Sequence, residues 1–255
     1  MNPFLRFLSE LQDITLMIWS TLIGLTKSPR YFKEMFHQMD LIGVGSIPII
    51  LLTGFFTGGV LTLQSYPTLA YYGGQSETGM LVTSSLIREL GPVLTALMVA
   101  GRIGSAISAE LGSMVVSQQI DAMRALGTDP IRKLVTPRIV ALVLMMPLLT
   151  VTADIFGIMG GAIAGNQIYG HDYNVFLNSM RNGIQIEHII GGMMKPFAFG
   201  FIIGIISCHK GLGTSGGTVG VGRSTTNAVV LSSIVVIIAD FFLSRVIQTL
   251  LVTRY

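Results

Sequence analysis

The sequence predicts an all-α integral membrane protein, with a helix at the membrane surface, about five transmembrane helices and a cytoplasmic coupling helix. Hydrophobic residues make up 51% of the 255 residues and charged residues only 11%, whereas a soluble domain usually carries about 25% charged residues. The mean hydropathy is +0.68. The run from Leu41 to Ser76 contains no Asp, Glu, Lys or Arg, and about 20 apolar residues are enough to cross a bilayer.

Further long apolar runs predict the other spans. Together with the first run they lie at about 41–76, 79–108, 139–165, 191–208 and 228–251. Small residues recur at every fourth position within them, as in Gly161 and Gly165, Gly200 and Gly204, or Gly101, Ser105 and Ala109. Small residues on one face let helix backbones approach closely. The stripes fit either a dimerisation face or packing within one bundle.

The N-terminal segment differs from these runs. Residues 4–25 have apolar side chains at helical spacing, but the uninterrupted apolar part after Asp13 is only about a dozen residues, too short to span. We therefore divide the chain into 1–36, an interfacial amphipathic helix with a basic connection, and 37–255, a transmembrane domain. The alternative is a short first span.

Orientation follows from the distribution of Lys and Arg, which accumulate on the cytoplasmic side of membrane proteins. With five spans and the N-terminus inside, eleven of the sixteen basic residues lie in inside segments. The outside segment near 70–78 holds none, and the one near 166–190 holds only Arg181. We therefore expect a cytoplasmic N-terminus and an outside C-terminus. The inside basic residues are Arg6, Lys27, Arg30, Lys33, Arg102, Arg124, Arg132, Lys133, Arg138, Lys210 and Arg223.

The cytoplasmic segment between the second and third spans predicts a short amphipathic helix over about 117–126. Ser117 is a residue type that caps helix starts, Gly127 suits the left-handed residue after a helix end, and Pro130 prevents continuation. Such a helix can dock into a groove of a cytoplasmic partner. The alternative is a solvated loop helix without a partner. The candidate coupling residues are Gln118, Gln119, Ile120, Asp121, Met123, Arg124 and Leu126.

Ionisable residues stand within the apolar runs, among them Arg88 and Glu89 in the second, Lys195 in the fourth and Asp240 in the fifth. Each costs about 2.5–3.5 kcal/mol at the centre of a spanning helix. Two cations and two anions on three helices predict an intramembrane charge network. The network either changes partners as the bundle moves or serves only to hold the bundle together.

Catalytic motifs are absent from the sequence. The glycine-rich stretch Gly211–Gly222 contains a G-x-G-x-x-G match, but a span precedes it and no soluble helix follows, so we reject a dinucleotide site and expect a flexible connection capped by Ser224 or Thr225. No phosphate-binding G-x-x-x-x-G-K-[ST] loop occurs. The four histidines show no metal-ligand spacing, and the single cysteine, Cys208, excludes an internal disulfide. We expect no enzyme activity, no metal and no cofactor in this chain.

One block has a specific pattern: Arg88 to Met114 reads RELGPVLTALMVAGRIGSAISAELGSM. This stretch resembles the MlaE (YrbE) family, the permease subunits of ABC-type lipid transporters. The resemblance continues through Gln119–Met123, Gly127–Pro130, Pro137-Arg138, Thr214–Gly217, Val221–Thr226 and Asp240, and so covers nearly the whole chain. Gln118 stands where the family more often has glutamate.

The resemblance implies a homodimer of permeases in the Gram-negative inner membrane. It implies a cytoplasmic ABC ATPase dimer, which binds ATP-Mg and docks on the 117–126 helix. A STAS-domain protein would accompany the ATPase, and a hexamer of MCE-domain subunits would lie on the periplasmic side. The expected cargo is phospholipid, moved between the inner and outer membranes to maintain outer-membrane lipid asymmetry. No nucleic acid is expected as a partner.

Lipid tails need an apolar cavity, and the outer end of the first span offers suitable side chains. We predict that they line a lipid site at the dimer interface. ATP-driven closure of the partner ATPase would push on the 117–126 helix, and this push would squeeze the lipid site. Ordinary packing or a lipid-facing surface is the alternative for each of them. The predicted residues are Leu61, Leu63, Gln64, Tyr66, Leu69 and Tyr72.

Two other functional classes remain. One is an ion-coupled secondary transporter, in which the four intramembrane charges relay ions. Such folds often carry an internal repeat, and none is visible here. The other is a non-transporting membrane scaffold that recruits an ATPase.

Overall fold

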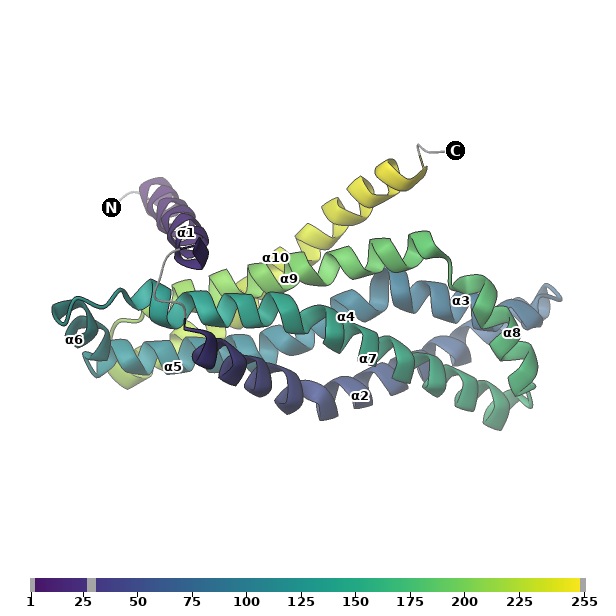
Figure 1. Cartoon of the computed structure of the whole chain (residues 1–255). Coiled ribbons are helices and arrows are strands. Elements are labelled where there is room, and N and C mark those ends of the chain that lie inside the picture. The colour runs from purple at the N-terminus through teal and green to yellow at the C-terminus, as the bar shows by residue number, and fades with distance from the viewer. Residues whose placement is uncertain (1–2, 27–30, 253–255) are drawn as a thin grey trace. The chain divides into compact units, whose positions relative to one another are not determined.

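The computed structural model describes residues 3–26 and 31–252, and all regular structure within them is helical (Figure 1). Lys27 and Arg30, which we place at the cytoplasmic surface, lie outside these ranges. The elements in chain order are α1 (Pro3–Thr26), α2 (Phe32–Tyr71), η1 (Gln75–Glu77), α3 (Thr78–Ser85), η2 (Leu86–Leu90), α4 (Gly91–Val99), η3 (Ala100–Gly104), α5 (Ser105–Val116), α6 (Gln119–Ala125), η4 (Ile131–Val135), α7 (Thr136–Tyr169), α8 (Tyr173–Gly183), α9 (Ile186–Leu212) and α10 (Gly217–Val252).

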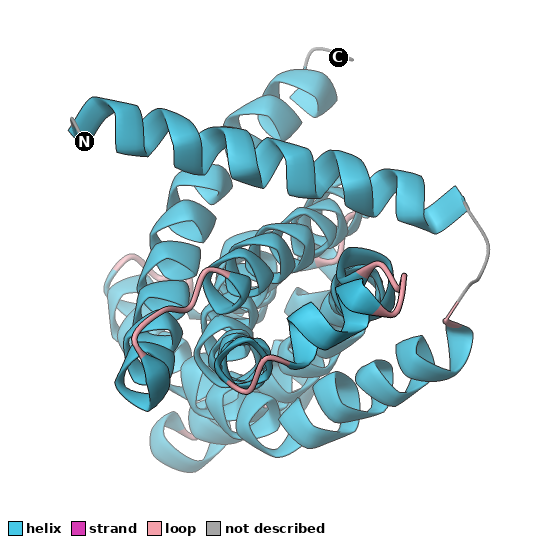
Figure 2. Cartoon of the chain, turned by 90° about the vertical axis from the view of Figure 1, so that its left-hand side faces the viewer, coloured by secondary structure: helices cyan, strands magenta, loops and turns pink. Residues whose placement is uncertain are grey.

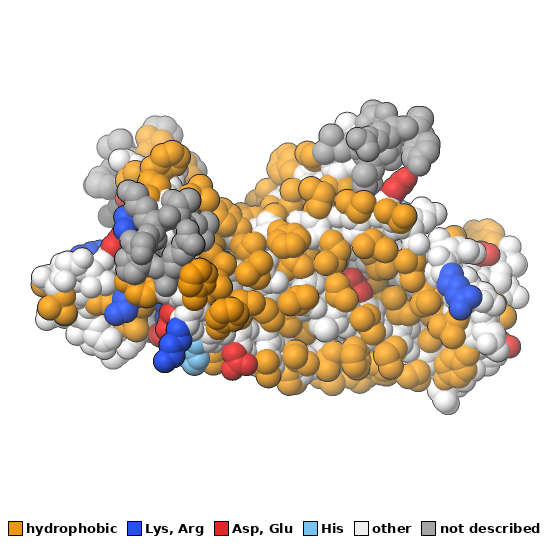
Figure 3. Space-filling view, viewed as in Figure 1, with side chains coloured by type: hydrophobic (Ala, Val, Ile, Leu, Met, Phe, Trp, Pro, Cys, Tyr) orange, Lys and Arg blue, Asp and Glu red, His pale blue; other side chains and the backbone are white. Residues whose placement is uncertain are grey.

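Five helical stretches of the described chain are long and apolar enough to cross a membrane: Phe32–Tyr71, Gln75–Val116, Ile131–Tyr169, Ile186–Leu212 and Gly217–Thr249. The prediction of five spans is therefore confirmed. Each helical stretch is longer than the apolar run within it, because the polar residues that flank the run are helical as well. Large apolar side chains such as Leu52, Phe56 and Phe241 are exposed on these helices, and hydrophobic side chains cover most of the long helices in Figure 3. This is an all-α membrane protein, whose exposed apolar surface has lipid as its solvent.

Three five-residue segments, η2, η3 and η4, are π-helical. A π-helical turn widens the helix by one residue and often marks a functional site. Pro92 follows η2 closely, and proline has no N–H to donate to the preceding turn. The second span is therefore irregular where the predicted charges Arg88 and Glu89 lie.

The chain forms two compact units, and most long helices contribute to both. The first unit comprises residues 1–44, 99–145 and 199–236, and so contains α1, α5, α6 and η4. The second comprises residues 45–98, 146–198 and 237–255, and contains η1, α3, η2 and α8.

Glycines bring α2 and α7 into backbone contact within the second unit. A Cβ atom at Gly58 would lie 1.8 Å from the carbonyl oxygen of Gly157, which leaves no room for any other residue. Gly161 likewise faces Thr62 of α2. In the first unit, Gly204 faces Ile139 of α7. At Gly161 and Gly204, the small-residue stripes pack within the chain.

Helix α1 is one continuous helix in Figure 2. Within the first unit Met17 and Thr21 are buried, while Leu16, Trp19 and Leu22 are exposed. Helix α1 is not among the five stretches with the length and apolarity of a span. Its location in the headgroup layer stays a prediction. The predicted boundary at residue 36 falls inside α2, which begins at Phe32.

Helix α6 lies within the predicted 117–126 segment, but Ser117 does not cap it. The Ser117 hydroxyl donates to the Ser113 carbonyl of α5, and Gln118 occupies the N-cap position with φ 59°. The predicted cap was wrong because the Ser117 hydroxyl bonds back to α5, to the same Ser113 carbonyl that accepts the Ser117 N–H, and so does not cap α6. Gly127 has φ 73°, as expected for the residue after a helix end.

The glycine-rich connection is shorter than predicted. Helix α9 ends at Leu212 and α10 begins at Gly217, so Ser224 and Thr225 lie inside α10 and do not cap it. The Thr225 hydroxyl donates to the Gly222 carbonyl, and the Thr214 hydroxyl donates to Ser224 Oγ. These hydroxyls therefore find acceptors within the connection and the first turns of α10.

Candidate functional site

The second unit contains a buried lysine that contacts residues of two other spans. Lys195 on α9 is 2% exposed, and its ammonium donates to Glu89 Oε2 at 2.5 Å. The same nitrogen lies 3.1 Å from Asp240 Oδ1 of α10. This is an ion-pair distance without hydrogen-bond geometry, since Asp240 Oδ1 has no hydrogen-bond partner among the described residues. Two carboxylates from different helices therefore compensate one buried ammonium.

The irregular second span supplies a third contact. Lys195 Nζ donates to the backbone oxygen of Arg88 at 2.9 Å. In a regular α-helix that oxygen would accept from the N–H of residue 92, which is proline. The Ser244 hydroxyl of α10 donates to Glu89 Oε2 at 3.1 Å. The lysine thus satisfies a carbonyl that the proline leaves open, and Glu89 is held by two helices.

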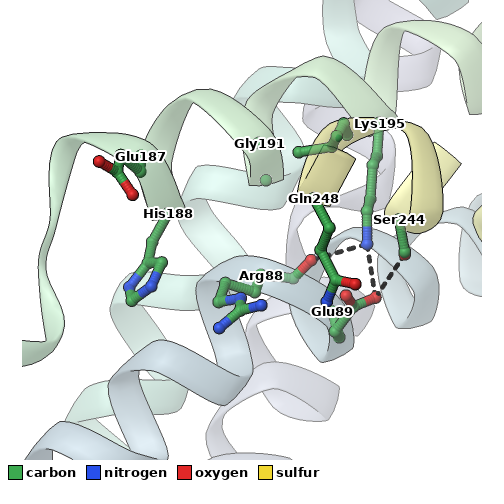
Figure 4. Close-up of a pocket in the computed structure, with 10 residues that line it drawn as sticks. Arg88, Glu89, Glu187, His188, Gly191, Lys195, Ser244 and Gln248 are labelled. Carbon is green, nitrogen blue, oxygen red and sulfur yellow. Dashed lines mark hydrogen bonds and ion pairs between the residues drawn. The ribbon is translucent and has the colours of Figure 1, made fainter. Parts of the chain in front are cut away.

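The Arg88 side chain takes a different direction. In Figure 4 it turns away from the Lys195 ammonium, toward the side of the pocket where His188 lies. The structure therefore brings together three of the four predicted charges, and Arg88 joins them through its backbone oxygen alone. The separation arises because adjacent residues on a helix point about 100° apart.

These groups line a cavity of about 120 Å³. Seven of its ten lining residues are polar or charged, and the side chain of Glu89 is 42% exposed. Several lining residues, such as Glu187, Ser244 and Gln248, were not predicted. In the sequence they are ordinary polar residues, and nothing in their spacing distinguishes them from other polar residues. The lining residues are Arg88, Glu89, Glu187, His188, Gly191, Gly192, Lys195, Ser244, Ile247 and Gln248.

A predominantly apolar groove of about 360 Å³ lies on α2 and is lined by Phe56, Thr57, Val60, Leu61, Gln64 and Leu90. A second groove shares Leu61 and Leu90 with it and also reaches Arg88 and Glu89. The charged cavity and the apolar groove therefore lie on neighbouring residues around η2. Four of the α2 residues, at 57, 60, 61 and 64, follow the spacing of one helix face, a pattern that could have located the groove from the sequence.

The six predicted lipid-binding residues do not share one face. Leu61 and Gln64 line the groove. Tyr66 instead stacks on Tyr169 of α7 with ring centroids 4.4 Å apart, and the Tyr169 hydroxyl donates to the Leu63 carbonyl. Leu69 is partly buried, and Tyr72 is strongly exposed after the end of α2. The set extends over three turns of helix, so its members necessarily point in several directions.

The coupling residues divide in a similar way. Ile120 is buried within the first unit, so it anchors α6 to its own chain. Asp121 and Arg124 are exposed and pair with each other at 3.1 Å. Leu126 is 82% exposed. Gln118 and Gln119 are exposed as well, and Met123 is partly buried.

No group of three His, Cys, Asp or Glu side chains in the described part of the chain could hold a metal ion. Cys208 is buried on α9.

Comparisons with known proteins place these features in a family. The family model of the permease MlaE matches residues 35–246. A probable ABC transporter permease protein of Rickettsia felis is 40% identical over 243 residues, which cover 94% of this chain and 93% of that protein. A probable ABC transporter permease protein of Synechocystis is 44% identical over 212 residues, with 83% and 81% covered. The intermembrane phospholipid transport system permease protein MlaE of Haemophilus influenzae is 37% identical over 231 residues, with 90% and 88% covered. The chain described here, with its five spans and its charge cluster around Lys195, belongs to the MlaE permease family.

Proposed function

We propose that this chain is the membrane-embedded permease subunit of an ATP-driven transporter that moves phospholipid between the inner and outer membranes and so maintains outer-membrane lipid asymmetry. One observation carries the proposal: a cavity lined by charged residues and an apolar groove lie on neighbouring residues around η2. A phospholipid has the same division, with a charged headgroup and apolar tails. The name of the Haemophilus relative, an intermembrane phospholipid transport permease, supports the same cargo.

The chemistry of the cavity suits a headgroup. Arg88 contributes a guanidinium, which pairs well with phosphate, and its side chain is not used by the Lys195 cluster (Figure 4). Glu89 and Glu187 also line the cavity and contribute carboxylates. Tails would lie along Leu61 and Leu90 in the groove.

The energy source is a separate subunit in this proposal. A cytoplasmic ABC ATPase dimer binds ATP-Mg and docks on the exposed part of α6. A second copy of this chain, a STAS-domain protein and a periplasmic MCE-domain hexamer complete the assembly. The names of the relatives as ABC transporter permeases support an ATPase partner.

The location and the mechanism follow from the same assignment. The chain lies in the Gram-negative inner membrane with its N-terminus in the cytoplasm and its C-terminus in the periplasm, as the distribution of basic residues favours. ATP-driven closure of the partner pushes on α6, tilts the second and third spans and squeezes the lipid out of its site.

The decisive experiment is purification of the tagged chain from its native membrane in mild detergent, followed by reconstitution into phospholipid vesicles. We expect an ABC ATPase and phospholipid to copurify, and lipid transfer to require ATP hydrolysis. Transfer that follows an ion gradient without ATP would establish the secondary transporter instead. Normal lipid traffic with a hydrolysis-deficient ATPase would establish the scaffold.

A further inference from the structure

Arg138 is among the largest fully buried side chains in the described chain and is only 1% exposed. It lies in the first turn of α7, in the first unit. A guanidinium stays protonated in proteins, so a buried arginine remains a charge that must be compensated. In the sequence Arg138 is one of the inside basic residues and part of the Pro137-Arg138 match to the family pattern, and neither observation gives it a role of its own.

Two acceptors from different elements compensate this charge. Arg138 Nη2 lies 2.7 Å from Glu110 Oε1 of α5, and Nη1 donates to the Leu134 carbonyl of η4 at 2.8 Å. The planar guanidinium carries donors in a fixed fork, which lets one side chain reach both acceptors. The α5 helix is thereby tied to the start of α7.

The position of this pair in the chain is distinctive. Glu110 precedes α6 and Arg138 follows η4. The ion pair therefore joins the two ends of the segment 110–138, which carries the coupling helix. The two other described ion pairs in this segment, Asp121–Arg124 and Asp129–Arg132, join residues three apart. They stabilise local turns and do not connect α5 with α7.

We propose that Glu110 and Arg138 are positioning residues that make α5, α6 and the first turns of α7 move as one body, so that a push on α6 reaches the second and third spans together. The proposal rests on the proposed function. A buried ion pair adds little net stability compared with apolar residues of similar size, whereas its directional bonds hold one arrangement of α5 and α7. The pair therefore acts on the coupling between ATP hydrolysis and lipid movement.

The test uses the complete complex, purified from native membranes and reconstituted into vesicles, with ATP hydrolysis and transfer of a fluorescent phospholipid measured in the same sample. For Glu110→Gln we expect hydrolysis to continue while phospholipid moved per ATP falls about fivefold or more, the lower end of typical couplings between distant sites. The matched control is Glu10→Gln. Glu10 pairs with Lys210 at 3.2 Å in the same unit and has a similarly exposed side chain, but it lies outside this segment. The control should keep the wild-type ratio.

Glu110→Gln leaves a buried charge without its carboxylate, so this variant can lose stability. The double variant Glu110→Leu/Arg138→Met removes both charges and keeps apolar volume, and we expect it to fold and still show a low ratio. A wild-type ratio of lipid to ATP in either folded variant would refute the positioning role. A wild-type complex without ATP-dependent transfer would instead refute the proposed function, so the two failures are distinguishable.

Discussion

The ammonium of Lys195 donates a hydrogen bond to the backbone oxygen of Arg88, more than a hundred residues earlier in the chain. That oxygen lacks its regular helical donor because residue 92 is proline. A break in one span and a charge in another therefore stabilise each other. The same lysine compensates Glu89 and Asp240, so three spans depend on one side chain.

Replacing this lysine should separate stability from transport. Lys195→Met leaves two carboxylates without their cation, and removal of one partner of a buried pair typically costs about 3–5 kcal/mol. We expect a lower unfolding temperature in detergent and a loss of lipid transfer. The triple variant Lys195→Met/Glu89→Gln/Asp240→Asn removes the uncompensated charges, and it should recover stability without recovering transfer. Recovery of both would mean that the cluster only holds the bundle together.

Filling the apolar groove should block the cargo. Leu61 lines the groove, and Leu61→Trp would occupy its volume. We expect lipid transfer to fall about tenfold, equivalent to about 1.4 kcal/mol, with the ATPase still bound. Leu52→Trp is the control, because Leu52 lies on the same helix and is exposed but does not line the groove. Equal transfer by the two variants would argue against a tail site at Leu61.

The contact between α2 and α7 should tolerate no side chain at Gly58. Gly58→Ala places a methyl group against the Gly157 carbonyl, and overpacking of this kind typically costs about 1–3 kcal/mol. Thermal unfolding of the purified variant measures the loss. Gly101→Ala is the control, because its Cβ would meet nothing within 4 Å. An unchanged unfolding temperature for Gly58→Ala would contradict the close backbone approach.

The exposed end of the coupling helix should govern ATPase binding. Leu126→Asp introduces a charge at an exposed apolar position just after α6, and loss of an interface hot spot costs about 2 kcal/mol or more. We expect the amount of copurifying ATPase to fall at least about tenfold. Val219→Asp, at a similarly exposed apolar residue near the start of α10, should retain the ATPase. Undiminished copurification with Leu126→Asp would place the ATPase contact elsewhere.

The sequence by itself determined the number of spans and the positions of the short helix α6 and its end. Those features depend on local signals: apolar runs long enough for a bilayer, and a glycine after a helix that adopts positive φ, as Gly127 does. The family pattern around Arg88–Met114 is likewise local. Each signal acts over a few turns of chain and needs no knowledge of neighbouring helices.

Only the tertiary structure decided which side chains meet. It paired Lys195 with Glu89 and turned the adjacent Arg88 side chain away, directed Leu61 into a groove and Tyr66 onto Tyr169, and buried Arg138 against Glu110. These outcomes depend on the rotation of each helix about its axis, which is set by packing against helices distant in the sequence. A π-helical turn holds one extra residue and so rotates the side chains that follow it about the helix axis. Hydropathy alone could therefore not have predicted which side chains meet.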